Sequence, residues 1–352
     1  MSTGCGPRPD GEPVHAAAAE RSALEHYVAP LRPHLSGRTV TELCVNRPGE
    51  LWIEASDSGW QAIAAPWATY RWAAHLGRLL ASASQQRLTP EHPLLSTALP
   101  DGERVQLVAP PATEPGVIAL AIRKPGASRR ELADLAAAGL LCVCRQAGQT
   151  GEADRALGAA FDSRDWLTFL RLAVRARQTV LVSGATGSGK TTLTRALIAE
   201  IDPSERLVTI EDAPELSLDG HRNAVRLFYS KDEQGLSRLT PKHLLESCLR
   251  LRPERIMLAE LRGAEAYEYL RSVNSGHPGS ITSIHAGSCA AAFEQLALLV
   301  KESAAGREMR RSEIHELLGN VVDVVVQCRR QGGVRRVDEL WWRGRAQPAT
   351  PG

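Results

Sequence analysis

A glycine-rich segment ending in a lysine and two threonines carries the strongest chemical signal of this 352-residue chain. It fits the phosphate-binding pattern GxxxxGK(S/T) and consists of Gly184, Ala185, Thr186, Gly187, Ser188, Gly189, Lys190, Thr191 and Thr192. The glycines allow successive backbone N–H groups to turn inward, and a helix expected from Lys190 adds unpaired N–H donors. We expect Lys190 to reach the β- and γ-phosphates of ATP, Thr191 to bind Mg²⁺, and Thr192 to add a phosphate contact. The segment predicts nucleotide binding, a property that kinases and binding switches share.

Carboxylates end two apolar segments further along the chain. Residues 207–211 end in Glu211, with Asp212 next, and residues 255–259 are followed by Glu260. If these segments are parallel strands, their carboxyl ends line the crevice that also holds the glycine-rich loop. A carboxylate there can hold the Mg²⁺ shell or polarise the attacking water. We assign the water to Glu260 and the metal shell to Glu211, while the sequence leaves open which of the two is the better base.

A histidine and four arginines complete the candidate site. His285 follows a third apolar segment, residues 280–284, where a neutral imidazole can hydrogen-bond the γ-phosphate or the water. Guanidinium groups offer a fixed fork of donors that matches phosphate oxygens. We expect at least one of four arginines to act on the phosphates, and the sequence does not rank Arg123, Arg250, Arg252 and Arg262.

The segments that position these residues alternate between strand and helix patterns over residues 161–342. Such alternation is typical of a mainly parallel sheet with crossover helices. A helix with an apolar stripe through Trp166 and Val174 is expected to begin at Asp162 or Ser163. Further strands are expected at residues 179–183, 207–211, 255–261 and 280–284, with a closing hairpin at 321–328 and 334–342.

The preceding residues predict a smaller α+β domain with a hairpin at 40–53 and a helix at 67–80. The fold class is therefore α/β, a C-terminal domain with a mainly parallel sheet preceded by a smaller N-terminal α+β domain. An Ala-rich stretch with a helix at 131–141 reads as a linker. The expected division is a flexible tail at 1–24, the N-terminal domain at 25–125, the linker at 126–160, the nucleotide-binding domain at 161–342 and a tail at 343–352.

Composition limits the classes of function. The length suffices for two cores, and 43% hydrophobic residues argue against a disordered chain. A net charge of +2 gives no overall field for nucleic acid, so no direct sequence-specific nucleic-acid binding is expected. Seven dispersed cysteines without CxxC pairs fit reduced thiols in a cytoplasmic protein. The N-terminus does not resemble a signal peptide and no apolar run reaches membrane-spanning length, so we expect a soluble protein with at most peripheral membrane contact.

Four motifs in this order resemble those of the secretion ATPases of the RecA-like superfamily. They are the P-loop, an acidic box at 210–216, the strand that leads to Glu260, and a histidine box at 275–286. The chain is most similar to the VirB-type hexameric traffic ATPases of type IV secretion and conjugation systems. The residues that carry this similarity are 41–49, 122–125, 252–256, 260–262, 280–289 and 293–296, so it spans about residues 25–340. Ala259 departs from the pattern, because many relatives have glycine there.

The resemblance implies a RecA-like ATPase domain that uses ATP and Mg²⁺ within a cytoplasmic homohexamer at the inner membrane. Its implied partners are further copies of the chain, other secretion-channel ATPases and inner-membrane channel proteins, with peripheral association at the cytoplasmic face of that membrane. Ring motions would drive pilus assembly and substrate transfer. ATP would lie between the two domains, with Arg123 reaching it from the first, and Arg250 and Arg252 would supply charge between sites.

Other readings remain. A type II secretion or type IV pilus ATPase is the nearest: the assembly ATPases usually carry a CxxC zinc module, which this chain lacks, but retraction motors lack it as well. DNA-translocating coupling ATPases usually have membrane spans, and no apolar run of that length is found in this sequence. A small-molecule kinase would need an acceptor pocket and a lid, and the sequence shows no sign of either. A nucleotide-gated scaffold with negligible turnover is a different class, and the combination of Lys190, Glu211, Glu260 and His285 argues against it.

Overall fold

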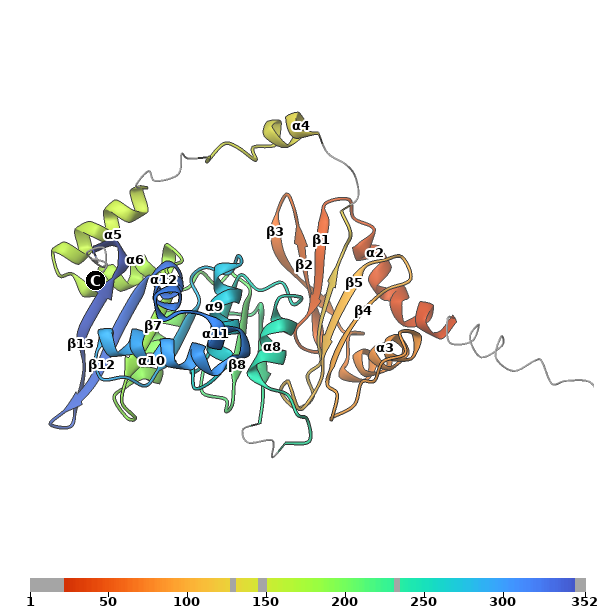
Figure 1. Cartoon of the computed structure of the whole chain (residues 1–352). Coiled ribbons are helices and arrows are strands. Elements are labelled where there is room, and N and C mark those ends of the chain that lie inside the picture. The colour runs from red at the N-terminus through yellow and green to blue at the C-terminus, as the bar shows by residue number, and fades with distance from the viewer. Residues whose placement is uncertain (1–21, 127–130, 145–150, 231–234, 346–352) are drawn as a thin grey trace, which may run out of the picture. The chain divides into compact units, whose positions relative to one another are not determined.

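The computed structural model describes residues 22–126, 131–144, 151–230 and 235–345. The chain separates into two compact units, Met1–Ala127 and Ser128–Gly352, each built on a sheet of its own (Figure 1). The protein is thus a mixed α/β chain with two sheets, as predicted. Within the described ranges, no helix combines the length and the apolar character needed to cross a membrane.

The first unit contains a six-stranded sheet in the order β3-β2-β1-β6-β5-β4, in which all pairings are antiparallel. Its strands are β1 (Val40–Val45), β2 (Gly49–Ala55), β3 (Gly59–Ala65), β4 (Leu94–Ala98), β5 (Arg104–Val108) and β6 (Ala119–Arg123). The pairing of β1 with β2 confirms the predicted hairpin. Its helices include η1 (Ala29–Leu31), α2 (Arg32–Leu35) and α3 (Tyr70–Ala83), and residues 22–28 before η1 are also helical.

Helix α3 covers the core of the first unit. It begins later than predicted because Thr69 caps it, accepting a hydrogen bond from the Trp72 backbone N–H at 3.1 Å. Leu76 and Leu80 recur on one face of the helix and are buried in the same core as Leu43 on β1.

The second unit contains a seven-stranded sheet in the order β13-β12-β7-β11-β10-β8-β9. Every pairing in it is parallel except that of β12 with β13. Its strands are β7 (Val180–Gly184), β8 (Leu207–Glu211), β9 (Ala224–Phe228), β10 (Arg255–Leu258), β11 (Ile281–Ile284), β12 (Val324–Gln331) and β13 (Val334–Trp342). All residues of β7, β8, β10 and β11 are buried, as is usual for parallel strands covered on both faces.

Helices pack around this sheet. They are α5 (Glu152–Asp162), α6 (Trp166–Arg175), α7 (Lys190–Ile198), α8 (Pro241–Cys248), α9 (Glu265–Asn274), α10 (Cys289–Glu302), α11 (Ala304–Glu308), α12 (Arg311–Val321) and the short η3 (Arg343–Arg345). The predicted cap of α6 was wrong, because Asp165 caps it and accepts a hydrogen bond from the Thr168 backbone N–H at 3.2 Å. Asp162 instead belongs to α5 and Ser163 follows it.

The stretch predicted as a linker holds two helices. Helix α4 (Leu132–Ala137) lies within the predicted helix at 131–141 and is shorter. Residues 127–130 and 145–150 of this stretch lie outside the described residues. Most of α5 also lies in the stretch, yet Leu157 and Ala160 are buried in the core of the second unit. Residues 1–21 and 346–352, which make up most of the two predicted tails, are likewise outside the described residues.

Parallel pairing places the carboxyl ends of β7, β8, β10 and β11 at one edge of the sheet. Gly184 ends β7 at this edge, while Glu260 and His285 follow β10 and β11 there. The topology therefore brings the glycine-rich loop and two of the predicted catalytic residues to the same place.

Candidate active site

The glycine-rich loop leads from β7 directly into α7, which is the context predicted for a P-loop. Gly184 has φ 153°, and a Cβ there would lie 2.5 Å from the carbonyl oxygen of Cys328. Gly189 precedes α7 with φ 104°, a conformation that side-chain-bearing residues rarely adopt. Ser188, within the loop, is only 2% exposed. The loop thus requires glycine at both of its ends.

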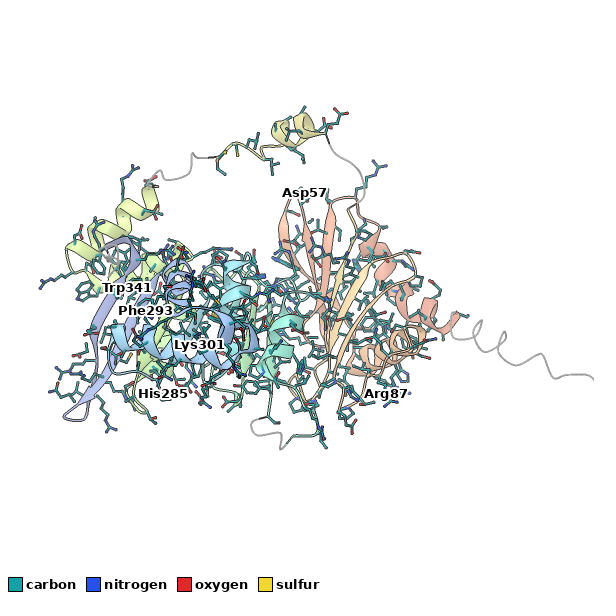
Figure 2. The ribbon with its side chains drawn as sticks, viewed as in Figure 1. Asp57, Arg87, His285, Phe293, Lys301 and Trp341 are labelled. Carbon is teal, nitrogen blue, oxygen red and sulfur yellow. The ribbon has the colours of Figure 1, made fainter. Side chains whose placement is uncertain are left out.

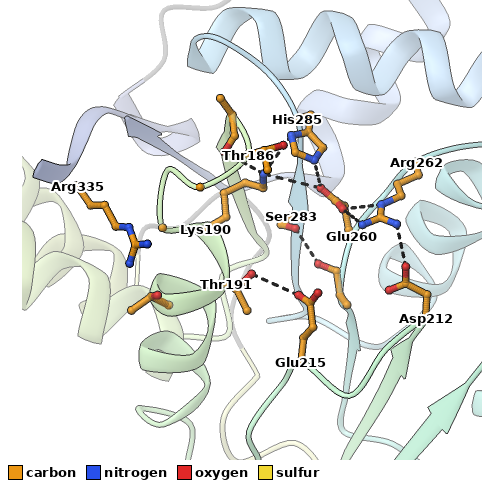
Figure 3. A pocket seen from close by; sticks show the side chains of 15 residues that line it. Thr186, Lys190, Thr191, Asp212, Glu215, Glu260, Arg262, Ser283, His285 and Arg335 are labelled. Carbon is orange, nitrogen blue, oxygen red and sulfur yellow. Dashed lines mark hydrogen bonds and ion pairs between the residues drawn. The ribbon is translucent and has the colours of Figure 1, made fainter. Parts of the chain in front are cut away.

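A pocket of about 340 Å³ opens at this loop (Figure 3). It brings together ten predicted site residues, namely Ala185, Thr186, Gly187, Gly189, Lys190, Thr191, Thr192, Glu260, Arg262 and His285. Asp212, Glu215, Ala259, Ser283 and Arg335 also line it. The predicted residues from three separate sequence regions therefore converge on one cavity.

Lys190 stands at the centre of the pocket. Its Nζ donates to the carbonyl oxygen of Gly184 at 2.8 Å and lies 3.8 Å from Glu260 Oε1 and 3.2 Å from His285 Nδ1. Burial lowers the pKa of Lys190, and the negative charge of Glu260 opposes that effect. The ammonium group is thus held at the mouth of the loop, where phosphates of a nucleotide can reach it.

The contacts of His285 determine which nitrogen of a neutral ring carries the proton. Lysine can only donate, so Nδ1 of His285 accepts from Lys190 and the proton of a neutral ring sits on Nε2. Nε2 then donates to Glu260 Oε1 at 2.8 Å. His285 therefore links the P-loop lysine to the carboxylate that follows β10.

Arg262 holds the other oxygen of Glu260. Its Nε donates to Glu260 Oε2 at 2.5 Å, and its Nη1 donates to Asp212 Oδ2 at 2.8 Å. Burial works to lower the pKa of Arg262, but the hydrogen bond and charge of Glu260, together with Asp212, raise it. Both oxygens of Glu260 therefore have cationic or hydrogen-bond-donating neighbours, which fix the orientation of the carboxylate.

Glu211 does not reach this pocket. It is 0% exposed, and its Oε2 accepts hydrogen bonds from the backbone N–H groups of Glu215 and Leu216 at 2.8 and 2.7 Å. Its Oε1 accepts from Thr209 Oγ1 at 2.7 Å and from Arg226 Nε at 3.2 Å. This geometry corrects the sequence-based assignment of Glu211 to the metal shell, because its lone pairs already hold the chain that follows β8.

Carboxylates of that following chain face the pocket instead. Glu215 Oε2 lies 3.4 Å from Thr191 Oγ1, and Arg195 Nε donates to the Glu215 carbonyl oxygen at 2.5 Å. Glu211 thus holds the segment from which Asp212 and Glu215 line the pocket.

Three predicted arginines do not line the pocket. Arg123 ends β6 in the first unit, with its Nε 3.6 Å from Glu42 Oε1. Arg250 and Arg252 precede β10, whereas Glu260 follows it, so they lie at the opposite end of this strand from the site. Any action of these three on a nucleotide stays a prediction.

Sequence reasoning missed Glu215 and Arg335 as pocket residues and gave Asp212 no role of its own. The carboxylates carried a local signal, since both belong to the acidic box that begins at the end of β8. Arg335 carried none, because it comes to the P-loop only through the pairing of β13 with β12 and of β12 with β7.

Comparison with known proteins agrees with this geometry. The model of the family described as type II/IV secretion system protein matches residues 26–339. The type IV secretion system protein VirB11 of Bartonella quintana (strain Toulouse) is 42% identical over 325 residues, covering 89% of this chain and 91% of the relative. VirB11 of Brucella suis biovar 1 is 44% identical over 336 residues, covering 94% of this chain and 93% of the relative.

A solved structure is similar over nearly the same length. The crystal structure of the VirB11 ATPase from the Brucella suis type IV secretion system, in complex with sulphate, superposes with a TM-score of 0.87 at 43% identity. The match covers 93% of this chain and 96% of that one. These relatives are type IV secretion proteins, which favours that reading over a type II or pilus ATPase.

Proposed function

Because the chain belongs to the type II/IV secretion system protein family and is an ATPase of a type IV secretion system, we propose that it cleaves ATP in the P-loop pocket with Glu260 as the residue that positions water. The observation that carries this proposal is the position of Glu260, 2.8 Å from His285 Nε2 and 3.8 Å from Lys190 Nζ. An oriented carboxylate beside the P-loop lysine is the arrangement that phosphoryl transfer to water needs.

The chain's own residues divide the work. Lys190 and the loop N–H groups bind the phosphates of ATP and stabilise the charge that develops on them. Glu260 accepts a hydrogen bond from the attacking water, while His285 and Arg262 hold its two oxygens in place. Incoming phosphates compete with Glu260 for Lys190, so nucleotide binding frees the carboxylate for the water.

The pocket also suits Mg²⁺. The ion prefers oxygen ligands, and it is usually held by one or two protein groups together with substrate phosphates. Thr191 Oγ1 and Glu215 Oε2 lie 3.4 Å apart in the pocket, with the Asp212 carboxylate also in its lining. Thr191 would hold the ion and Glu215 and Asp212 its outer shell. When bound, Mg²⁺ neutralises charge on the phosphate oxygens.

Assembly forms a further part of the proposal. We infer a homohexamer of RecA-like ATPase domains at the cytoplasmic face of the inner membrane, in contact with other secretion-channel ATPases and channel proteins. In this ring Arg123, Arg250 and Arg252 are the further arginines that we expect to act on nucleotide phosphates. Hydrolysis would then drive pilus assembly and substrate transfer. The similarity to VirB11 over most of both chains supports this proposal.

Phosphate release tests the role of Glu260. We expect Glu260→Gln to lower kcat by about 10²–10⁴-fold, the range for loss of a general acid–base group, while ADP affinity stays near that of the unaltered protein. Lys190→Ala should lose both nucleotide affinity and turnover. If Glu260→Gln released phosphate at the normal rate, water positioning by Glu260 would be wrong. If the unaltered protein released none, the scaffold alternative would stand.

A further inference from the structure

The β12–β13 hairpin packs directly against the P-loop. Strand β12 pairs with β7 up to Cys328, which lies opposite Gly184, and then continues beyond the end of β7. On the other side, β13 is tied to α10: Phe293 and Trp341 meet edge to face with ring centroids 4.8 Å apart (Figure 2), and Glu339 Oε2 accepts from the Cys289 N–H at 2.7 Å. The hairpin arms are thus held beside the loop.

Four arginines gather near the turn of this hairpin. They form two cross-strand pairs, Arg329 with Arg336 and Arg330 with Arg335. Like charges placed opposite each other on neighbouring strands destabilise a hairpin. Arg329 lies 3.2 Å from Asp338 Oδ2, which compensates one pair. Among the residues that the structure describes, no carboxylate pairs with Arg330 or Arg335 in this way. A bound anion would supply the negative charge that this pair lacks.

Arg335 is the member of this group that lines the nucleotide pocket. Its stem lies on the last glycine of the P-loop, since a Cβ on Gly189 would be 3.2 Å from Arg335 Cδ. No hydrogen bond or ion pair engages the Arg335 guanidinium within the described parts of the chain. Arg336, the next residue, points to the other face of β13 and is not part of the pocket lining.

Arg335 and the hydrolytic residues lie on opposite sides of the loop. Figure 3 shows Arg335 on one side of Lys190, and Glu260, His285 and Arg262 on the other. The γ-phosphate must lie beside Glu260, where the water attacks, so the rest of the nucleotide extends away from Glu260 and toward Arg335. The α-phosphate is the anion on that side, and a guanidinium can meet two of its oxygens at once.

We propose that Arg335 binds the α-phosphate of the nucleotide in the P-loop pocket. This inference rests on the proposed function, since it takes ATP to occupy that pocket with its γ-phosphate at Glu260. It adds a nucleotide contact from the β12–β13 hairpin. Binding of ATP or ADP thereby supplies the anion that the Arg330 and Arg335 pair lacks, which stabilises the hairpin.

Dissociation constants of ADP and ATP for Arg335→Gln test the proposal, with Arg336→Gln as the matched control. Both variants remove one positive charge from exposed neighbouring positions of β13, so both are expected to fold. Loss of a charge-assisted phosphate contact should weaken both nucleotides by about tenfold or more in Arg335→Gln. Arg336→Gln should bind them as the unaltered protein does.

Several results would overturn the assignment. Unchanged ADP affinity in Arg335→Gln, or equal losses in the two variants, would exclude a specific contact. Weaker binding of ATP alone would place Arg335 at the γ-phosphate, and weaker binding of ADP with unchanged GDP affinity would place it at the base. Lys190→Ala separates the two proposals. If Lys190→Ala binds ADP normally, the proposed function of the P-loop itself fails. If Lys190→Ala loses ADP affinity while Arg335→Gln keeps it, only the Arg335 contact is rejected.

Discussion

Replacing Glu211 tests whether this residue supports a turn or binds a metal ion. In Glu211→Gln one oxygen remains to accept from the N–H groups of Glu215 and Leu216, but the charge that pairs with Arg226 is lost. A hydrogen bond to a charged group contributes about 1.5–3 kcal/mol, so we expect a loss of about 2 kcal/mol in the free energy of unfolding. Glu211→Ala removes the charge beside Arg226 and also leaves the buried Leu216 N–H without its acceptor, so it should lose about 3–5 kcal/mol.

Thermal unfolding in metal-free buffer measures these losses. At about 2–4 °C per kcal/mol for a unit of this size, Glu211→Gln should lower the melting temperature by roughly 4–8 °C and Glu211→Ala by roughly 6–20 °C. Glu215→Gln is the matched control, because its carboxylate faces the pocket at 3.4 Å from Thr191. It should leave the melting temperature nearly unchanged and raise the Mg²⁺ concentration needed for hydrolysis.

The opposite pattern would refute the structural argument. If Glu211 were a metal ligand, removing its charge would leave the metal-free protein as stable as before and would change only the Mg²⁺ dependence of hydrolysis. An unchanged melting temperature for Glu211→Ala would therefore return Glu211 to the metal shell.

Three further outcomes follow from particular contacts. Gly184→Ala places a Cβ 2.5 Å from the Cys328 carbonyl oxygen, so it should lower the free energy of unfolding by about 1–3 kcal/mol and abolish ADP binding in calorimetry. Arg255 is 0% exposed, and its guanidinium donates to Glu205 at 2.6 and 2.8 Å, so Arg255→Ala should cost about 3–5 kcal/mol in urea unfolding. A loss no larger than that of the exposed control Arg336→Ala would contradict this. Burial lowers the pKa of His277, so the unfolded chain binds more protons just below about pH 6.5 and stability falls as the pH drops through that window. His277→Gln should flatten this part of the urea-unfolding profile, and an unchanged slope would exclude the effect.

Local pattern was enough for much of the site. The P-loop could be read from residues 184–191 because its glycines, lysine and following helix act within one short stretch. Glu260 and His285 could be placed together because carboxyl ends of parallel strands share one edge of a sheet. Arg262 was one of four arginines that the sequence did not rank, and only the structure shows that it turns back to Glu260.

Side-chain direction at the end of β8 could not be read in the same way. Neighbouring residues of a strand point to opposite faces, so Glu211 and Asp212 had equal claims on the pocket before the structure distinguished them. The cap of α6 was missed for a similar reason. Asp162, Ser163 and Asp165 all suit the position, and only the hydrogen bond to Thr168 identifies Asp165.

The sequence by itself determined which residue types could do chemistry, namely a phosphate cradle after one strand and a carboxylate and a histidine after two later strands, and it determined membership of a family of secretion ATPases. Only the tertiary structure decided which carboxylates face the nucleotide, which one supports the turn, and that Arg335 stands beside Gly189. The physical reason is the separation along the chain of the residues that must interact. Loop and helix formation depend on a few adjacent residues, whereas the approach of β13 to the P-loop depends on strand pairing across about 145 residues of chain, which no local pattern encodes.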